Sequence, residues 1–145
     1  MAQSNLIVAV LLGLCAGCSS ECGLDDDVRL FAGETARDCG SVAVDGDRAD
    51  VDACVAEAFD AGEPFIARYE QSGLDSNVIS AVASNTEGSV KLFQWDSSPC
   101  GGSGCDPVTH VRSCEGPALS QETSEDPLAL PITCDRVGLP QRVCG

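Results

Sequence analysis

The sequence predicts an α+β domain in which one amphipathic helix packs across an antiparallel β-meander of three to four strands, with disulfides stapling the layers together. Three observations predict this fold. A helical spacing of apolar residues runs through residues 47–62, and a spacing of two replaces it between residues 65 and 95. Cysteine is frequent, at ten in 145 residues. A chain of this length is expected to have one core.

The first 17 residues have the pattern of a cleaved signal peptide. Residues 6–14 form an uninterrupted apolar run, and polar residues follow from Ser19 onward. A helix that spans a bilayer needs about 20 apolar residues, so this run is too short and is typical of a leader. We therefore expect residues 1–17 to be removed.

The segment Leu14-Cys15-Ala16-Gly17-Cys18 resembles the lipobox of bacterial lipoproteins, in which Ala-Gly precedes the cysteine that is acylated. It differs from that pattern in having Cys15 where leucine is usual, and no Lys or Arg occurs in the first 28 residues. The resemblance implies that Cys18 is the lipidated N-terminus and that this lipid attaches the protein to a membrane. It also implies a place in the bacterial cell envelope, at the outer membrane if there is one because Ser19 follows the cysteine. Without the lipid, the protein would be secreted.

Residues 18–38 are expected to be the acylated N-terminus and an acidic tether. Three consecutive acids, Asp25 to Asp27, and few apolar residues indicate a solvated segment. Its short apolar patch, Leu30-Phe31, leaves open the alternative that it docks as an N-terminal strand. Residues 39–145 are then a single disulfide-rich α+β domain.

One helix is predicted between Asp47 and Gly62. Its apolar residues recur at the spacing of a single helical face, and they are Val51, Cys54, Val55, Ala58 and Phe59. Asp47 or Asp50 can cap the start, and Gly62 followed by Pro64 ends the helix. The acids around its start do not form an EF-hand calcium loop, because the sixth position counted from Asp45 is Asp50 rather than Gly and the twelfth is not Glu.

Short strands are predicted after this helix. Apolar and polar residues alternate over residues 65–70, which predicts a half-buried strand, and two further strands follow at residues 78–83 and 90–95. A weaker fourth strand is predicted at 108–112. The proline- and acid-rich residues 115–131 indicate a loop. Residues 132–144 are expected to be tied to the rest of the domain through their cysteines.

Disulfides are the predicted role of the cysteines, in an oxidising compartment. No Cys-x-x-Cys pair lies beyond the leader, which argues against zinc. We expect Cys39 to pair with Cys54 across a short loop, and Cys100 to pair with Cys105 around a glycine-rich loop. With Cys15 removed and Cys18 acylated, the disulfide candidates are Cys22, Cys39, Cys54, Cys100, Cys105, Cys114, Cys134 and Cys144.

No residue pattern indicates catalysis. The single histidine, His110, lies in a strand pattern with no nucleophile or acid at a diagnostic spacing. Ser103 sits in a Gly-rich run but lacks the helix that must follow a nucleophile elbow, because Asp106-Pro107 comes next. We therefore predict that the protein is not an enzyme and has no catalytic, cofactor-binding or metal-binding residue. The net charge of −15 repels phosphate backbones, so nucleic acid is not an expected partner.

Residues 38–115 resemble a recurrent module of uncharacterised secreted bacterial lipoproteins, through Asp38-Cys39-Gly40, the helix with Cys54 and the segment Gly62 to Phe65. The expected function is a binding or structural role at the envelope, with the membrane and another envelope protein as partners. The alternative is a secreted inhibitor of an extracellular hydrolase, because a helix laid across a sheet is similar in outline to cystatins and β-lactamase inhibitor proteins. In that case, the exposed contact loop would be Cys100 to Cys105.

Overall fold

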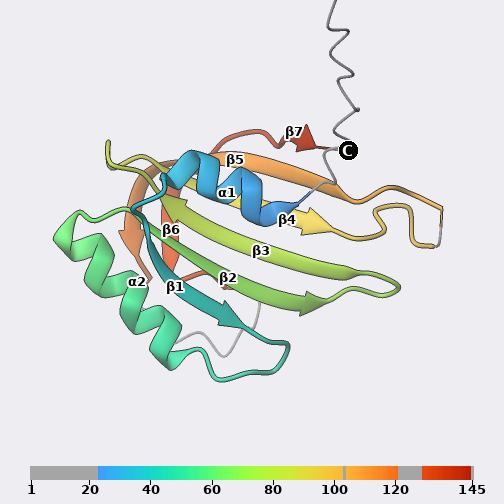
Figure 1. Ribbon diagram of the computed structural model, residues 1–145, viewed down its shortest axis with the longest axis horizontal. Coiled ribbons are helices and arrows are strands. Elements are labelled where there is room, and N and C mark those ends of the chain that lie inside the picture. Colours follow the sequence, from blue (N-terminus) through green and yellow to red (C-terminus); the bar gives the residue numbers. More distant parts are fainter. Residues whose placement is uncertain (1–22, 103, 121–128, 145) are drawn as a thin grey trace, which may run out of the picture.

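A seven-stranded sheet lies between two helices in the computed structural model, which describes residues 23–102, 104–120 and 129–144 (Figure 1). In chain order the elements are α1 (Leu24–Ala32), β1 (Arg37–Val42), α2 (Ala49–Ala61), β2 (Phe65–Ser72), β3 (Asn77–Ser84), β4 (Val90–Asp96), β5 (Val108–Leu119), β6 (Ile132–Val137) and β7 (Gln141–Cys144). The strand order across the sheet is β1-β2-β3-β4-β5-β6, and β7 also pairs with β5.

The predicted fold class, one helix on three to four antiparallel strands, is wrong. The sheet has seven strands, and a helix packs on each of its faces. The sheet is also not purely antiparallel, because β1 pairs with β2 in parallel. The correct part of the prediction is the central meander, in which β2, β3, β4 and β5 are consecutive antiparallel neighbours.

The parallel pair arises because α2 carries the chain back along β1 before β2 begins, which is a crossover connection. The sequence Arg-Asp-Cys-Gly-Ser-Val of β1 has no regular alternation of apolar and polar residues. Its sequence pattern therefore does not predict a strand. In the sheet, β1 is an edge strand with β2 as its hydrogen-bonded neighbour.

Residues 24–38, predicted as an acidic tether, instead form α1 and the start of β1. Leu24, Val28 and Ala32 recur every four residues and are buried against the sheet. The three acids Asp25, Asp26 and Asp27 occupy the first turn, where carboxylates favour the positive end of the helix dipole. The acidic run therefore begins a helix, and Leu30-Phe31 is part of that helix rather than a strand.

The prediction of a loop from residue 115 is also wrong at its beginning, because β5 continues to Leu119. Beyond Cys114, β5 has left β4 and pairs with β6. Pro117 lies in this part of the strand, where the missing neighbour on one side makes its lack of an N–H tolerable. Residues 121–128 of the predicted loop lie outside the described residues.

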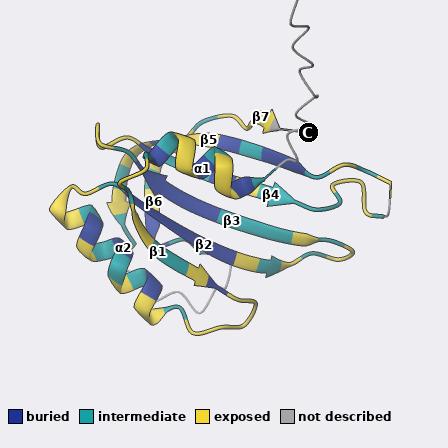
Figure 2. Ribbon diagram, viewed as in Figure 1, coloured by how far each residue is buried: buried dark blue, intermediate teal, exposed yellow. Residues whose placement is uncertain are grey.

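Two apolar cores result, one on each face of the sheet. Figure 2 shows the buried residues along β2 and β3 and on both helices. Alternate residues of β2 contribute to both cores, with Phe65 facing α2 and Ile66 facing α1. The prediction that β2 is half-buried is therefore wrong, because Ile66 is fully buried and Arg68 is only 8% exposed. Each helix needs a sheet face to bury its apolar stripe, and β2 lies under both.

Arg68 connects α1 to the sheet. Its Nε donates to Asp25 Oδ1 of α1 at 2.6 Å, and its Nη1 donates to Asp38 Oδ1 of β1 at 2.8 Å. Asp38 also accepts from Arg29 Nη2 at 2.8 Å and from the Gly40 N–H at 3.0 Å. The buried guanidinium thus has a carboxylate from each of two neighbouring elements.

Burial alone would raise the pKa of Asp38, but the hydrogen bonds from Arg68 and Gly40 and the charges of Arg68 and Arg29 outweigh it and lower the pKa. A carboxyl whose pKa is lower in the folded state stabilises the fold above its unfolded pKa and loses that contribution as the pH falls.

We therefore expect Asp38→Asn to lower the free energy of unfolding at neutral pH by about 1 to 2 kcal/mol. The difference from the wild-type protein should shrink as the pH falls below the ordinary aspartate value of 3.8, because the wild-type carboxyl then becomes protonated too. Urea unfolding at several pH values measures both effects. Asp75→Asn, in an exposed turn, is the control, and a pH-independent loss in Asp38→Asn would contradict the prediction.

Candidate functional site

The Cys100–Cys105 loop joins β4 to β5, and its disulfide forms as the sequence predicts, with the two Cα atoms 6.1 Å apart. Gly101 has a φ of 74°, a left-handed conformation that favours glycine. Inside the loop, Ser98 Oγ donates to the Gly102 carbonyl at 3.1 Å, and the Ser98 N–H donates to Asp96 Oδ1 at 2.9 Å. Ser103 lies outside the described residues.

The turn between β2 and β3 lies at the same end of the sheet as this loop (Figure 1). Two hydrogen bonds join the bases of these two connections: the Asn77 N–H donates to Ser97 Oγ at 2.9 Å, and the Ser97 N–H donates to the Asn77 carbonyl at 3.0 Å. We call residues 73–76, 97–102 and 104–107 together the hairpin end.

The tip of the β2–β3 turn carries a fully exposed leucine. Leu74 is 103% exposed, the highest value among the large apolar side chains of the described residues. The turn beneath it is tight, because the Gly73 N–H donates to the Ser76 carbonyl at 3.0 Å. A Cβ on Gly73 would lie 2.6 Å from that same carbonyl oxygen, so only glycine fits. The leucine is therefore presented on a constrained backbone.

Two other disulfides hold the body of the fold. Cys39 pairs with Cys54 and ties β1 to α2, as predicted, with Cα atoms 5.5 Å apart. Cys114 pairs with Cys134 and ties β5 to β6, with Cα atoms 5.3 Å apart. Cys18 and Cys22 lie outside the described residues. Cys144 ends β7, but its side chain is not described.

The predicted cap of α2 is only partly correct. The Ala49 N–H donates to Asp47 Oδ1 at 2.9 Å, but the residue at the N-cap position is Arg48, whose side chain does not cap the helix. Asp50 lies in the first helical turn. Gly62 ends the helix in the left-handed conformation, as expected.

A polar cluster that the sequence did not reveal joins α2 to β2. The Tyr69 hydroxyl donates to Asp52 Oδ1 at 2.7 Å, and Arg48 Nε donates to Asp52 Oδ2 at 2.6 Å. The Arg48 guanidinium also lies 5.0 Å from the centre of the Tyr69 ring. Burial and the hydrogen bond to Asp52 raise the pKa of Tyr69, so its hydroxyl stays protonated and acts as a donor. These contacts tie the start of α2 to β2.

His110 lies on β5, opposite Gln94 of β4 and Arg142 of β7. The described residues contain no group of three or more side chains of the kinds that hold a metal ion. They also contain no helix that is long and apolar enough to cross a bilayer.

Comparisons of the chain with protein-family models, with curated proteins and with solved structures found no match.

We expect the disulfide of the hairpin end to matter less for folding than that between β5 and β6. Replacing Cys100 and Cys105 together by Ser should lower the free energy of unfolding by at most about 2 kcal/mol, because the two residues are only 5 apart in sequence. Replacing Cys114 and Cys134 by Ser should lower the free energy of unfolding by about 3 kcal/mol, because their sequence separation is 20. It should also disturb core packing, because Cys114 is buried. Denaturant unfolding without reductant compares the two variants, and a larger loss in the first pair would contradict this ranking.

Proposed function

We propose that this protein is a non-enzymatic binding protein of the bacterial cell envelope, anchored by a lipid on Cys18, and that it contacts another envelope protein through the hairpin end. The observation that carries the proposal is the exposure of Leu74 on a turn that is hydrogen-bonded to the neighbouring disulfide-closed loop.

An exposed apolar side chain on a constrained backbone is suited to anchoring a protein–protein contact. Burying a leucine side chain contributes about 1.5 to 3 kcal/mol, and little of this is lost to ordering when the loop is already fixed. The Cys100–Cys105 loop, whose base is hydrogen-bonded to the base of the Leu74 turn, adds exposed glycine and backbone groups at this end of the sheet. The exposed leucine and this loop lie at the same end of the sheet, so a partner that contacts one can also contact the other.

The disulfides support an extracytoplasmic location. Three cysteine pairs lie at bonding distance in the described residues, and disulfides persist mainly in oxidising compartments. The lipid anchor rests on the lipobox-like segment around Cys18.

A second candidate function is inhibition of an extracellular hydrolase. The projecting, disulfide-closed loop between Cys100 and Cys105 favours it, because an inhibitor must place a rigid loop in a partner's active-site cleft. In this case, the partner captured through the hairpin end would be a hydrolase, and its activity would fall when the protein binds.

We expect Leu74→Asp to weaken capture of the partner roughly tenfold or more, because the interface loses an apolar anchor and must desolvate a charge. Purified protein on a matrix, exposed to envelope extract and analysed by quantitative mass spectrometry, identifies proteins that depend on Leu74. Leu139→Asp, at a side chain 87% exposed between β6 and β7, is the matched control and should retain them. A set of captured proteins that is identical for both variants would contradict the assignment of the hairpin end.

We expect Cys18→Ser to abolish lipid processing and to release the protein from the membrane fraction, because several acyl chains are needed for stable anchoring. The fold should persist, since Cys18 lies outside the three described disulfides. Intact-mass analysis of the wild-type protein and fractionation of the variant test this. An unmodified N-terminus, or unchanged membrane association of the variant, would contradict the anchor.

A further inference from the structure

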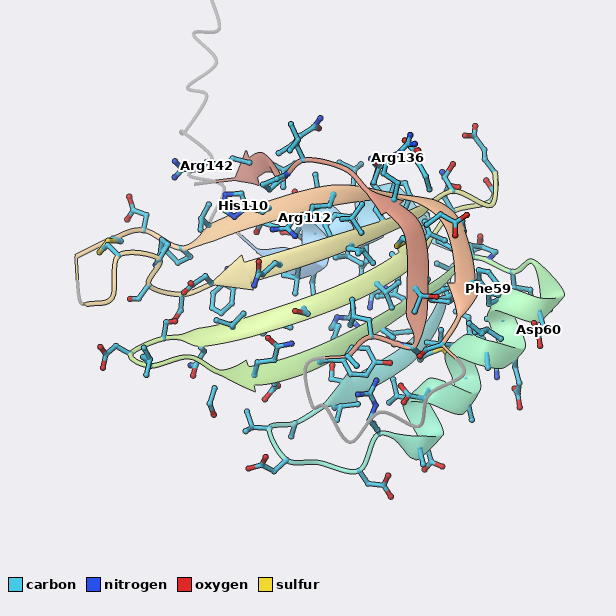
Figure 3. The ribbon with its side chains drawn as sticks, turned by 180° about the vertical axis from the view of Figure 1, so that it is seen from behind. Phe59, Asp60, His110, Arg112, Arg136 and Arg142 are labelled. Carbon is cyan, nitrogen blue, oxygen red and sulfur yellow. A yellow bond between two sulfur atoms is a disulfide. The ribbon has the colours of Figure 1, made fainter. Side chains whose placement is uncertain are left out.

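A row of polar side chains crosses the face of the sheet on which α2 packs, beyond the strands that α2 contacts. The strand register aligns Arg142 of β7 with His110 of β5, His110 with Gln94 of β4, and Gln94 with Ser80 of β3. Directly paired residues of antiparallel strands project from the same face. Figure 3 shows Arg142, His110 and Arg112 as neighbours along β5 and β7.

Arg112 belongs to the same face because it follows His110 by two positions on β5. The two Cα atoms are therefore about 7 Å apart along the strand. Arg112 and Arg142 are exposed, and His110 is half-buried between them. We call His110, Arg112 and Arg142 the cationic cluster.

The other basic side chains of the protein are engaged elsewhere. Five of the eight Lys and Arg residues form ion pairs, and Lys91 lies over the ring of Phe31 at 4.5 Å. Arg112 and Arg142 are the remaining two, and neither has an ion pair with any of the described residues. In a chain of net charge −15, the two arginines without an acidic partner in the described structure thus lie on one face of one sheet.

This placement is unfavourable for the isolated protein, because like charges on neighbouring strands repel. Asp96, diagonal to His110 by register, is the carboxylate closest to the cluster along β4, and its Oδ1 accepts from the Ser98 N–H. The guanidinium charges of Arg112 and Arg142 thus have no carboxylate partner among the described residues, and a bound anion can neutralise them.

We propose that the cationic cluster binds a small ligand through an oxyanion group, a carboxylate, phosphate or sulfate. Guanidinium groups match these planar or tetrahedral oxyanions with paired N–H donors. A small ligand is favoured over an acidic macromolecule because the field of the whole protein repels a large anion, whereas a small one experiences mainly charges within the Debye length of about 8 Å.

The neighbouring side chains indicate that the ligand also carries polar groups. Gln94 is exposed beside His110, and Ser80 follows it in the row and accepts from Gln71 Nε2 at 3.2 Å. These amide and hydroxyl groups can hydrogen-bond a hydroxyl or amide of a ligand whose oxyanion lies on the two arginines. A polar organic anion, such as a hydroxycarboxylate, fits this row. The cationic cluster shares no residue with the hairpin end, so anion binding here is independent of the protein contact proposed there.

The test is titration of the purified, disulfide-intact protein with citrate, inorganic phosphate and sulfate at constant ionic strength, followed by amide chemical shifts in NMR spectra. We expect saturable shifts of the His110, Arg112 and Arg142 amides with at least one of the three anions. The anion that binds most tightly identifies the oxyanion. Arg112→Gln and Arg142→Gln should each weaken binding roughly tenfold, because each removes a charge-assisted hydrogen bond.

Arg136→Gln is the matched control, because it changes the net charge by the same amount but removes an exposed arginine that is paired with Glu115. It should leave the affinity within about twofold of the wild-type value. Absence of saturable shifts with all three anions would overturn the proposal, as would an equal loss of affinity in Arg136→Gln. Binding of a polyglutamate peptide without binding of any small anion would also overturn it, in favour of an acidic macromolecular partner.

Discussion

The buried guanidinium of Arg68 is the constraint on which the arrangement of the layers depends. It lies on the α1 face of β2, two positions after the buried Ile66, and an arginine there is tolerated only if its charge is paired. Asp25 of α1 and Asp38 of β1 supply the two carboxylates. The position of α1 on the sheet and the parallel pairing of β1 are therefore coupled through one side chain.

The same requirement explains why the N-terminal segment folds back onto the sheet. Without α1, Ile66, Ala81 and Phe93 would expose an apolar face, and Arg68 would lose one of its two partners. Apolar burial and charge pairing thus favour the same docked position. Residues that look like a solvated tether in sequence form a structural layer, because they bury the apolar face of the sheet that α2 does not cover.

The parts of the fold that the sequence predicts are those with a strong local period. The helical face around Val55 and the alternation in residues 65–95 are visible without any knowledge of the sheet, and they correspond to α2 and to β2 through β4. The prediction fails for β1 and α1, whose few apolar residues gain meaning only from the elements they pack on. For the candidate site, glycine and cysteine spacing is enough to predict the Cys100–Cys105 loop. The cationic cluster could not be predicted, because it requires the pairing of His110 with Arg142 across 32 positions of sequence.

The open edge of the sheet has a consequence for the protein at high concentration. β1 is short, its register with β2 shifts between Asp38 and Ser41, and its exposed side chains include charged Arg37 and Asp38. An irregular, charged edge is a poor template for a further strand from another molecule. Copies of this protein crowded together therefore gain little from pairing strands through the β1 edge.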